Sequence, residues 1–345
     1  MAYRIAINGL GRIGRCVLRA LYEATDYPQL RIVAVNDLAD IGTLAHLLRY
    51  DSTHGRFLGE VRQLDGALEV AGDRVQVFQS ADPDQLPWNA LAVDLVMECS
   101  GTFSDRETAT RHLRSGARRV LFSQPAERDV DATLVFGINH ETLTGRETVL
   151  SNASCTTNAI IPVVRALHES LGITNGVITT IHSAMNDQPV IDAYHHSDLR
   201  KTRSAMQSII PVETEIARGI GRILPDLAGR FEAYAVRVPT VNVSAIDLTL
   251  VTGKPCDAAA INALIRAESQ RLAQNILGYT EEPLASCDFN HDPRSAIVDL
   301  SFTRVSGSNL VKLLIWFDNE WAYANRMLDV AQYLAQLDER SGAKG

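Results

Sequence analysis

The chain of 345 residues has few cysteines, and no two of them form a CxxC pair. The five are Cys16, Cys99, Cys155, Cys256 and Cys287, an odd number spread over much of the chain. A disulfide scaffold or a structural zinc site would need closely and regularly spaced cysteines. This usage therefore predicts free thiols, no metal site and a reducing, cytoplasmic location.

Long apolar runs and clusters of one charge are also missing. No segment approaches about 18 uninterrupted apolar residues, so we expect no transmembrane helix, and the first eight residues do not resemble a signal peptide. Lysine and arginine number 33 against 41 aspartate and glutamate, which gives a formal charge of −8 without a basic run. This balance argues against nucleic acid or an anionic membrane as a partner. The hydrophobic content of 46% is sufficient for one or two well-buried cores.

The first part of the chain predicts a parallel sheet covered by helices. A strand over 4–8, a helix over 12–24 and a strand over 31–36 follow one another, an order typical of α/β domains. Further apolar runs, each long enough for one buried strand, cover 91–99, 119–123, 134–137 and 148–150. We therefore expect a doubly wound, Rossmann-like domain over residues 1–154.

The pattern changes after residue 154 and predicts a second, α+β domain with a mainly antiparallel sheet over 155–319. A polar stretch over 183–207 has no regular periodicity, and loops of that length are usually functional. The last helix, over about 322–337, is expected to return to the first domain. The elements expected within the second domain are helices over 155–171, 217–224 and 257–274 and strands over 176–182, 232–239, 243–251, 296–305 and 310–317.

A glycine-rich turn directly follows the first expected strand. Gly9, Gly11 and Gly14 form the pattern GxGxxG together with Leu10, Arg12 and Ile13. Such a turn lets backbone amides approach a pyrophosphate at a helix N-terminus, where the helix dipole favours the negative charge. Asp37 ends the second strand, where a carboxylate accepts hydrogen bonds from a ribose diol and repels a 2′-phosphate, which favours NAD over NADP. The alternatives are a turn that binds nothing, a turn that binds a flavin, and an Asp37 that only caps a helix.

A cysteine and a histidine are the best candidates for chemistry. Cys155 lies in the polar segment 151–158, at an expected helix N-terminus that would lower the pKa of its thiol and supply amides for an oxyanion. His182 ends the strand over 176–182 where the polar stretch begins, and is the best candidate for its base. Taken alone, a cysteine after a serine is more often inert, and a histidine at this place is more often structural.

Four segments together resemble the glyceraldehyde-3-phosphate dehydrogenase family. They are Asn-Gly-Leu-Gly-Arg-Ile-Gly at 8–14, Ser-Asn-Ala-Ser-Cys-Thr-Thr-Asn at 151–158, Arg-Val-Pro-Thr at 237–240 and Asp-Asn-Glu at 318–320. The resemblance spans almost the whole chain. It implies a homotetramer that binds NAD and oxidises a small phosphorylated aldehyde through a thioester. Cys155 and His182 fall on the family's catalytic positions.

The same resemblance implies roles for further residues. Asn319 matches the residue that orients the nicotinamide amide, and Ser123 lies at a strand end that faces the cofactor. Lys201 stands where relatives usually carry arginine. The residues that match the family's binding sites for the substrate phosphate and for inorganic phosphate are Ser154, Thr156, Thr214 and Arg237.

Two departures from the glycolytic pattern bear on the substrate. Met185 replaces a threonine, and the segment 211–216 reads Pro-Val-Glu-Thr-Glu-Ile. These variants are similar to the branch of the family that oxidises erythrose 4-phosphate to 4-phosphoerythronate on the route to pyridoxal phosphate. If Glu213 and Glu215 flank the attacking anion, they disfavour inorganic phosphate by roughly 1–3 kcal/mol, and water would cleave the thioester.

Three alternatives stay open. One is a phosphorylating glycolytic dehydrogenase. Another is a binding protein that senses NAD or nucleic acid without turnover. The last is a structural remnant whose motifs only maintain the fold.

Overall fold

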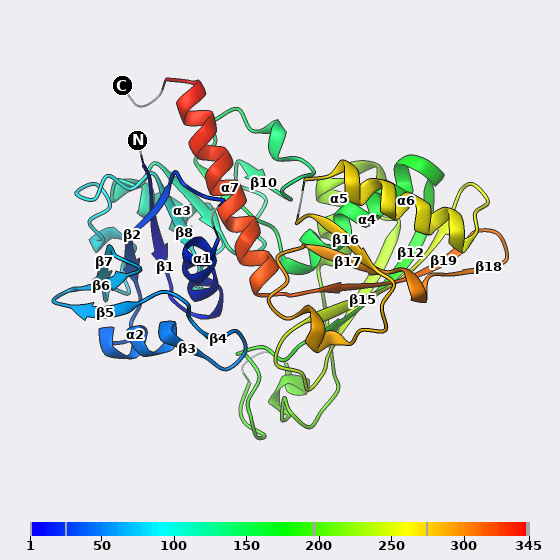
Figure 1. The fold of residues 1–345 in the computed structure, drawn as a ribbon, viewed down its shortest axis with the longest axis horizontal. Coiled ribbons are helices and arrows are strands. Elements are labelled where there is room, and N and C mark those ends of the chain that lie inside the picture. The colour runs from blue at the N-terminus through cyan, green and yellow to red at the C-terminus, as the bar shows by residue number, and fades with distance from the viewer. Residues whose placement is uncertain (1, 25, 196–197, 274, 343–345) are drawn as a thin grey trace. The chain divides into compact units, whose positions relative to one another are not determined.

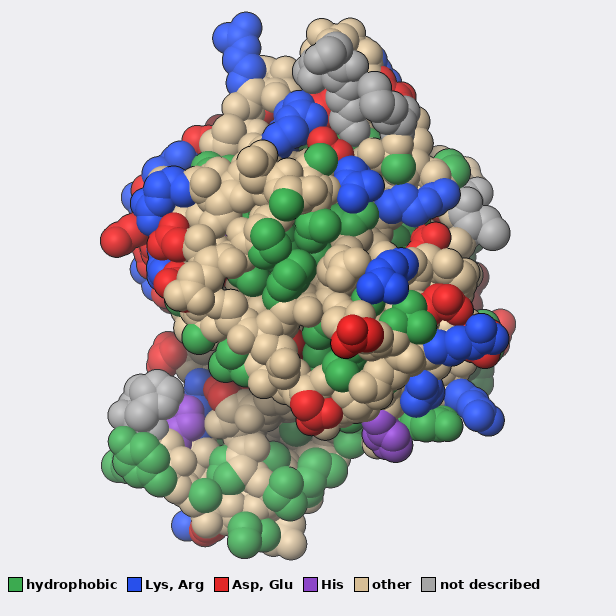
Figure 2. Space-filling model, turned by 90° about the vertical axis from the view of Figure 1, so that its left-hand side faces the viewer, with side chains coloured by type: hydrophobic (Ala, Val, Ile, Leu, Met, Phe, Trp, Pro, Cys, Tyr) green, Lys and Arg blue, Asp and Glu red, His purple; other side chains and the backbone are tan. Residues whose placement is uncertain are grey.

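The protein forms two compact units (Figure 1), described by a computed structural model over residues 2–24, 26–195, 198–273 and 275–342. The first unit contains 1–154 together with 323–345, and the second contains 155–322. Among the described residues, we find no helix that combines the length and the apolarity needed to cross a bilayer. On the face drawn in Figure 2, basic side chains lie among acidic ones rather than in one basic field.

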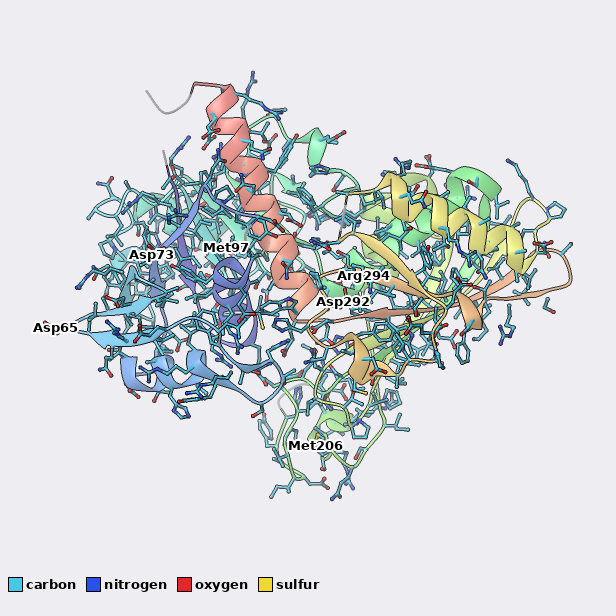
Figure 3. The ribbon with its side chains drawn as sticks, viewed as in Figure 1. Asp65, Asp73, Met97, Met206, Asp292 and Arg294 are labelled. Carbon is cyan, nitrogen blue, oxygen red and sulfur yellow. The ribbon has the colours of Figure 1, made fainter. Side chains whose placement is uncertain are left out.

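The first unit is built on a nine-stranded sheet in the order β10-β11-β9-β8-β1-β2-β7-β6-β5. The seven strands from β10 to β7 are parallel, and β6 and β5 add an antiparallel edge. Met97, labelled in Figure 3, is fully buried within this sheet. The strands are β1 Tyr3–Asn8, β2 Leu30–Asn36, β5 Val61–Leu64, β6 Ala67–Val70, β7 Asp73–Phe78, β8 Leu95–Glu98, β9 Arg119–Phe122, β10 Ala132–Thr133 and β11 Val149–Ser151, and a separate pair is formed by β3 Tyr50–Asp51 and β4 Gly55–Arg56.

Helices connect these strands, as expected for a parallel sheet. They are α1 Arg12–Glu23, α2 Ile41–Arg49 and α3 Arg106–Arg114, and α7 Trp321–Arg340 runs back into this unit. Asp40 and Asp105 cap α2 and α3 by accepting hydrogen bonds from Thr43 N and Thr108 N. The buried Arg119 of β9 binds Asp338 of α7 in a bidentate pair at 2.8 and 2.9 Å, which attaches the C-terminal helix to the sheet.

The second unit holds an eight-stranded, mainly antiparallel sheet. Its order is β13-β14-β12-β15-β19-β17-β16, with β18 paired to β19, and only β12 with β14 and β16 with β17 are parallel. The strands are β12 Ile173–His182, β13 Ile210–Val212, β14 Phe231–Arg237, β15 Ser244–Thr252, β16 Leu277–Thr280, β17 Ala296–Asp299, β18 Arg304–Ser306 and β19 Leu310–Phe317. The helices are α4 Cys155–Leu171, α5 Ile216–Ile223 and α6 Ala258–Arg271.

Most of the longest expected elements are present, and the fold class is confirmed. The strand expected over 134–137 is wrong, because the chain pairs instead at β10, two residues earlier. The single strand expected over 296–305 is interrupted at Leu300–Phe302 by a turn of 3₁₀ helix, in which Asp299 accepts from Ser301 N. The antiparallel edge β5–β6, with charged residues among its apolar ones, was not predicted.

Irregular structure dominates the second unit between β12 and β13. This segment, which includes Met206 in Figure 3, exposes several large apolar side chains. The exposed apolar residues of this segment are Met185, Val190, Ile191, Tyr194, Leu199, Met206 and Ile209.

Elsewhere in the unit, Asp292 and Arg294, also labelled in Figure 3, form an ion pair at 2.6 Å.

Candidate active site

The three glycines of the turn between β1 and α1 meet two different requirements. Gly9 has φ of +91°, and a Cβ there would lie 2.5 Å from the Ser100 backbone. A Cβ on Gly14 would lie 2.1 Å from the Gly9 carbonyl oxygen. Gly11, the N-cap of α1, has no neighbour within 4 Å of its Cβ position. The outer glycines therefore allow the tight packing, whereas Gly11 leaves the open approach that a pyrophosphate needs.

Asp37 supports this turn directly. Its Oδ2 accepts a hydrogen bond from Leu10 N at 2.7 Å, and its Oδ1 accepts one from Ala39 N at 3.0 Å. The carboxylate is thus held at the ends of β1 and β2, where a ribose diol would reach it. Arg12 is paired with Asp51 at 2.5 Å, so its guanidinium is already engaged. Ile13, beside it on α1, is partly exposed.

A buried polar network underlies the turn and was not found by sequence reasoning. Glu98, at the end of β8, accepts from Asn8 Nδ2 at 2.6 Å and from Ser100 N at 2.8 Å. Its Oε2 also lies 3.1 Å from His112 Nε2, while His112 Nδ1 accepts from Trp88 Nε1 at 3.0 Å. Polar residues ending apolar strands, as Asn8 and Glu98 do, were the available signal. The network holds Ser100 where Gly9 packs.

Cys155 is the first residue of α4, so the expected helix N-terminus is present. Its Sγ lies 3.8 Å from Thr156 Oγ1 and 3.8 Å from His182 Nε2. Ala153, two residues earlier, has φ of +54°, a strained conformation for a residue with a Cβ, and it is buried. Local strain and a helix start thus occur together beside the sulfur.

The hydrogen bonds of His182 identify its basic nitrogen. Nδ1 lies 2.8 Å from the carbonyl oxygen of Ser183, which can only accept, so Nδ1 carries the proton. In the neutral ring Nε2 is then the lone-pair nitrogen, and Nε2 is the atom that faces Cys155. Burial lowers the pKa of His182, which favours that neutral ring. The imidazole is therefore ready to accept a proton from the thiol.

The expectation that the helix N-terminus lowers the thiol pKa is wrong for the unassisted thiol. Burial raises the pKa of Cys155 to about 11, and the hydrogen bonds from Thr156 and from the backbone amide only partly oppose this. The cause is desolvation: removal of the thiolate from water destabilises it by more than these hydrogen bonds stabilise it. An unassisted thiol with this pKa is protonated near neutral pH, so a thiolate here would need a base, and His182 Nε2 is the neighbouring candidate.

Arg237 ends β14 in register with His182 at the end of the parallel strand β12. Its Nη1 donates to Asp187 Oδ1 at 2.5 Å and to Gln188 Oε1 at 3.1 Å. Lys201 Nζ contacts the other oxygen of Asp187 at 3.0 Å. Burial raises the pKa of Asp187, but the hydrogen bonds from Arg237 and Lys201 outweigh it and keep the pKa below its usual value. One carboxylate thus lies between two cations, which leaves one positive charge for an anion.

The N–H groups of Arg237 that Asp187 and Gln188 do not use are also suited to binding an anion. Within the described part of the chain, its Nε and Nη2 groups have no hydrogen-bond partner. A guanidinium with free N–H groups beside each other is suited to the oxygens of a phosphate. Asp187 and Gln188 were not predicted, although they lie in the polar stretch that ended the strand pattern.

The remaining predicted site residues occupy several places. Thr156 is buried beside the sulfur, and Ser154 is partly exposed just before it. Thr214 is partly exposed between β13 and α5, and Glu215, next to it, is exposed and paired with Arg218. Ser123 follows β9 in the first unit, where its N–H donates to the Glu98 carbonyl oxygen at 3.0 Å. Glu215 is thus not an isolated negative charge.

Asn319 lies on the short loop between β19 and α7 and is nearly buried. Its Oδ1 accepts from Ser183 Oγ at 3.1 Å and from Ser244 Oγ at 2.8 Å. The ends of β12, β14 and β19 and the start of β15 meet at one edge of the sheet. This edge brings His182, Arg237 and Asn319 to the same side of the second unit.

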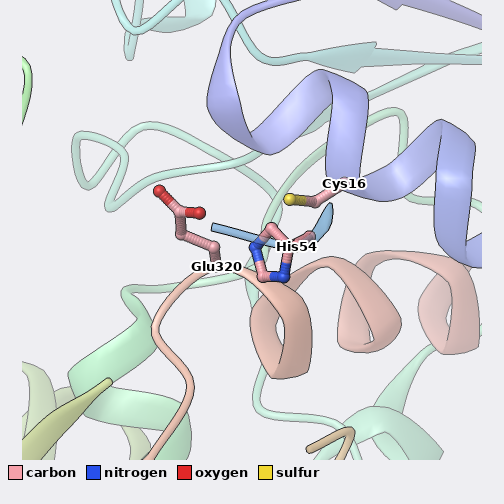
Figure 4. Close-up of side chains that lie close together, drawn as sticks. All are labelled: Cys16, His54 and Glu320. Carbon is pink, nitrogen blue, oxygen red and sulfur yellow. The ribbon is translucent and has the colours of Figure 1, made fainter. Parts of the chain in front are cut away.

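Cys16 on α1 and His54 between β3 and β4 have neighbouring side chains in the first unit (Figure 4). The third side chain labelled there, Glu320, belongs to the second unit. Two donors are fewer than the three or four protein ligands that zinc takes. We assign no metal to this pair.

A glycine-rich turn at the end of a parallel strand, and a cysteine at a helix start beside a histidine at a strand end, are the arrangement expected of a dinucleotide-dependent dehydrogenase with a thiol nucleophile. Comparison with family models gives the family. The NAD binding domain of glyceraldehyde 3-phosphate dehydrogenase matches residues 3–106, and the C-terminal domain of the same family matches 154–319. The chain belongs to the glyceraldehyde-3-phosphate dehydrogenase family, whose members act on small phosphorylated substrates.

The residues present fit NAD as cofactor. The open approach at Gly11 admits a pyrophosphate, and Asp37 provides the acceptor for a ribose diol. The N-terminal family model is itself an NAD-binding domain. When bound, NAD supplies the group that accepts a hydride.

Proposed function

We propose that the protein oxidises erythrose 4-phosphate to 4-phosphoerythronate through a thioester on Cys155, as an erythrose-4-phosphate dehydrogenase on the route to pyridoxal phosphate. The observation that carries the chemical part is the 3.8 Å contact between Cys155 Sγ and the unprotonated Nε2 of His182. A nucleophile with a base at this separation, and a fixed tautomer, fits covalent catalysis.

The steps follow from these two residues. His182 Nε2 takes the thiol proton while the sulfur attacks the aldehyde carbon, which gives a hemithioacetal bound to Cys155. The Cys155 amide and His182 stabilise its oxyanion. Loss of a hydride from the carbon of this oxyanion, for which bound NAD would supply the acceptor, converts it into a thioester, and the proton that His182 took from the thiol is released to water. Water then cleaves the thioester, releasing the free acid and restoring the thiol.

The substrate phosphate is assigned to Arg237. The free Nε and Nη2 donors of its guanidinium supply planar hydrogen bonds, and Thr156 and Thr214 add hydroxyl groups. Lys201 pairs with Asp187 and so offsets the negative charge of that carboxylate, which leaves the positive charge of Arg237 for the phosphate. Met185 has no hydroxyl to donate, which supports a phosphate position different from that of the glycolytic enzyme.

The choice of water as the deacylating nucleophile rests on Glu213 and Glu215. Both are exposed, and the pairing of Glu215 with Arg218 reduces its repulsion of phosphate. The expected exclusion of phosphate therefore falls toward the lower end of roughly 1–3 kcal/mol. A glyceraldehyde-3-phosphate dehydrogenase that releases an acyl phosphate is the second candidate, which this pairing favours.

Initial rates of NADH formation test the proposal. Purified protein and NAD are mixed with erythrose 4-phosphate or glyceraldehyde 3-phosphate, each with and without inorganic phosphate. We expect the higher kcat/KM with erythrose 4-phosphate and little effect of phosphate. A preference for glyceraldehyde 3-phosphate with a steep phosphate dependence would select the second candidate.

We also propose a homotetramer in a reducing cytoplasm. The exposed apolar side chains between β12 and β13, among them Ile191 and Tyr194, support burial against another copy. All five cysteines are free thiols, which supports the reducing compartment. Light scattering after gel filtration of the wild type and of I191D tests the assembly, and a wild-type monomer would contradict it.

A further inference from the structure

Two buried serines determine which end of the Asn319 side chain is free. Ser183 and Ser244 both direct their hydroxyl groups at Asn319 Oδ1, at 3.1 and 2.8 Å. Ser183 is fully buried and Ser244 is 1% exposed, so neither hydroxyl has access to bulk water. Oδ1 has two lone pairs, and both are used.

The opposite orientation of the amide leaves buried donors without acceptors. If Nδ2 faced the serines, it would donate to their oxygens, and both hydroxyl protons would need other acceptors. Within the described residues the only recorded partners of these two oxygens are Asn319 and, for Ser244, the amide of Ser183 at 3.1 Å. A buried unsatisfied donor costs about 1–3 kcal/mol. The serines therefore select the orientation in which Nδ2 points away from them.

The loop that carries Asn319 is held by the carboxylate of its neighbour Asp318. The neighbouring Asp318 is fully buried, and its Oδ1 accepts from Glu320 N at 2.9 Å and Trp321 N at 2.8 Å. Its Oδ2 accepts from His291 N at 2.7 Å and Asn242 Nδ2 at 2.8 Å. Four donors on one carboxylate fix the loop that carries Asn319.

Ser183 also links this amide to the base. Its carbonyl oxygen accepts from His182 Nδ1, its N–H donates to Ser244, and its hydroxyl donates to Asn319. The carbonyl sets the imidazole tautomer, and the hydroxyl sets the amide orientation. Replacing Ser183 with alanine removes the hydroxyl that orients the Asn319 amide and keeps the carbonyl that sets the His182 tautomer.

We propose that Ser183 and Ser244 are positioning residues that make Asn319 a hydrogen-bond donor toward the cofactor, so that the nicotinamide carboxamide is recognised through its carbonyl oxygen. The inference rests on the proposed function and on the role that the family resemblance implies for Asn319, contact with the nicotinamide amide. It goes further by defining which cofactor analogues the site accepts. An analogue that keeps the carbonyl and lacks the amide nitrogen retains the acceptor that Nδ2 needs.

Calorimetric titration with NAD and with acetylpyridine adenine dinucleotide, which carries a methyl group in place of the amide nitrogen, tests this without turnover. We expect wild-type Kd values for the two dinucleotides within about threefold of each other. In S183A/S244A the Kd for NAD should rise about tenfold, the loss of one oriented hydrogen bond. N319D puts an acceptor in place of Nδ2 and should raise the Kd for NAD at least as much.

A double-mutant cycle separates positioning from general structure. If the serines act through Asn319, S183A/S244A in an N319A background should leave the NAD Kd unchanged within about twofold. An equal loss in both backgrounds would overturn the proposal, as would wild-type protein that binds the acetylpyridine analogue more than about tenfold weaker than NAD. Melting temperatures verify that each variant is folded.

The pH profile of Cys155 alkylation gives a second readout. S183A keeps the carbonyl that binds His182, so its profile should match the wild type. A shifted profile would overturn the division of roles within Ser183. If no aldehyde is turned over, the proposed function fails, whereas the dinucleotide affinities still decide the inference.

Discussion

His182 and Arg237 are partners in register on the adjacent parallel strands β12 and β14. The strands end together, and Val238 N donates to the His182 carbonyl oxygen at 2.9 Å just beyond them. Parallel pairing therefore brings a base and a guanidinium, 55 positions apart in the numbering of the chain, to one sheet edge. The proposed proton transfer and the proposed anion binding depend on residues of neighbouring strands, so each can be tested alone.

Replacing His182 should change the pH dependence of thiol reactivity. Burial raises the pKa of Cys155 to about 11, so the thiolate fraction of an unassisted thiol falls about tenfold for each pH unit below that value. In H182N, alkylation by iodoacetamide should therefore be slow at pH 7 and rise steeply through pH 9. The wild type should react faster at pH 7 and show a shallower slope, since Nε2 accepts the proton. Superimposable profiles would remove His182 as the base.

Two glycines of the turn should respond differently to alanine. G14A places a Cβ 2.1 Å from the Gly9 carbonyl oxygen and should destabilise the protein by about 1–3 kcal/mol or more. G11A meets no atom within 4 Å and should cost no more than about 1 kcal/mol, yet its methyl group occupies the approach to a pyrophosphate and should weaken NAD binding. Urea unfolding and NAD titration measure the two effects. Normal NAD affinity in G11A would contradict the assignment of this turn.

Arg237 should act on the phosphate of the substrate rather than on the aldehyde. R237K keeps one positive charge and loses the planar pair of donors, so KM for the phosphorylated aldehyde should rise about 10–100-fold, equivalent to about 1.5–3 kcal/mol for charged hydrogen bonds. Erythrose without its phosphate is the matched substrate, and its kcat/KM should change little. Equal losses on both substrates would indicate a structural role instead.

The fold class followed from residue order, because alternating strand and helix patterns permit few architectures. The GxGxxG turn and Cys155 were predictable for a similar reason, since each follows a strand or begins a helix. The network of Glu98 and the orientation of Asn319 were not. Both depend on contacts between residues more than 70 positions apart, which no local pattern encodes.

The thiol pKa illustrates the same limit. The helix start at Cys155 was predicted from sequence, and its electrostatic consequence was argued from that start alone. Burial of the sulfur raises the thiol pKa, and this effect is larger than the lowering by the hydrogen bonds at the helix start. Burial arises from the packed structure. The direction of the shift therefore required three-dimensional information.

Under the proposed function, we expect Glu215 to influence how far phosphate competes with water. E215G removes a carboxylate together with the partner of Arg218, which leaves an unpaired cation on α5. The rate of NADH formation should then increase with inorganic phosphate more steeply than in the wild type. R218A is the matched control and should have the opposite effect, because it leaves Glu215 unpaired. Phosphate responses that do not differ among the three proteins would show that this pair does not influence deacylation.

Mass spectrometry of the protein quenched in acid during turnover tests the central claim most directly. With NAD and erythrose 4-phosphate, we predict an acyl adduct on the peptide that contains Cys155, absent without NAD and absent in C155S, which should still bind NAD. NADH formation with no adduct at Cys155, or with the adduct on another residue, would contradict the account.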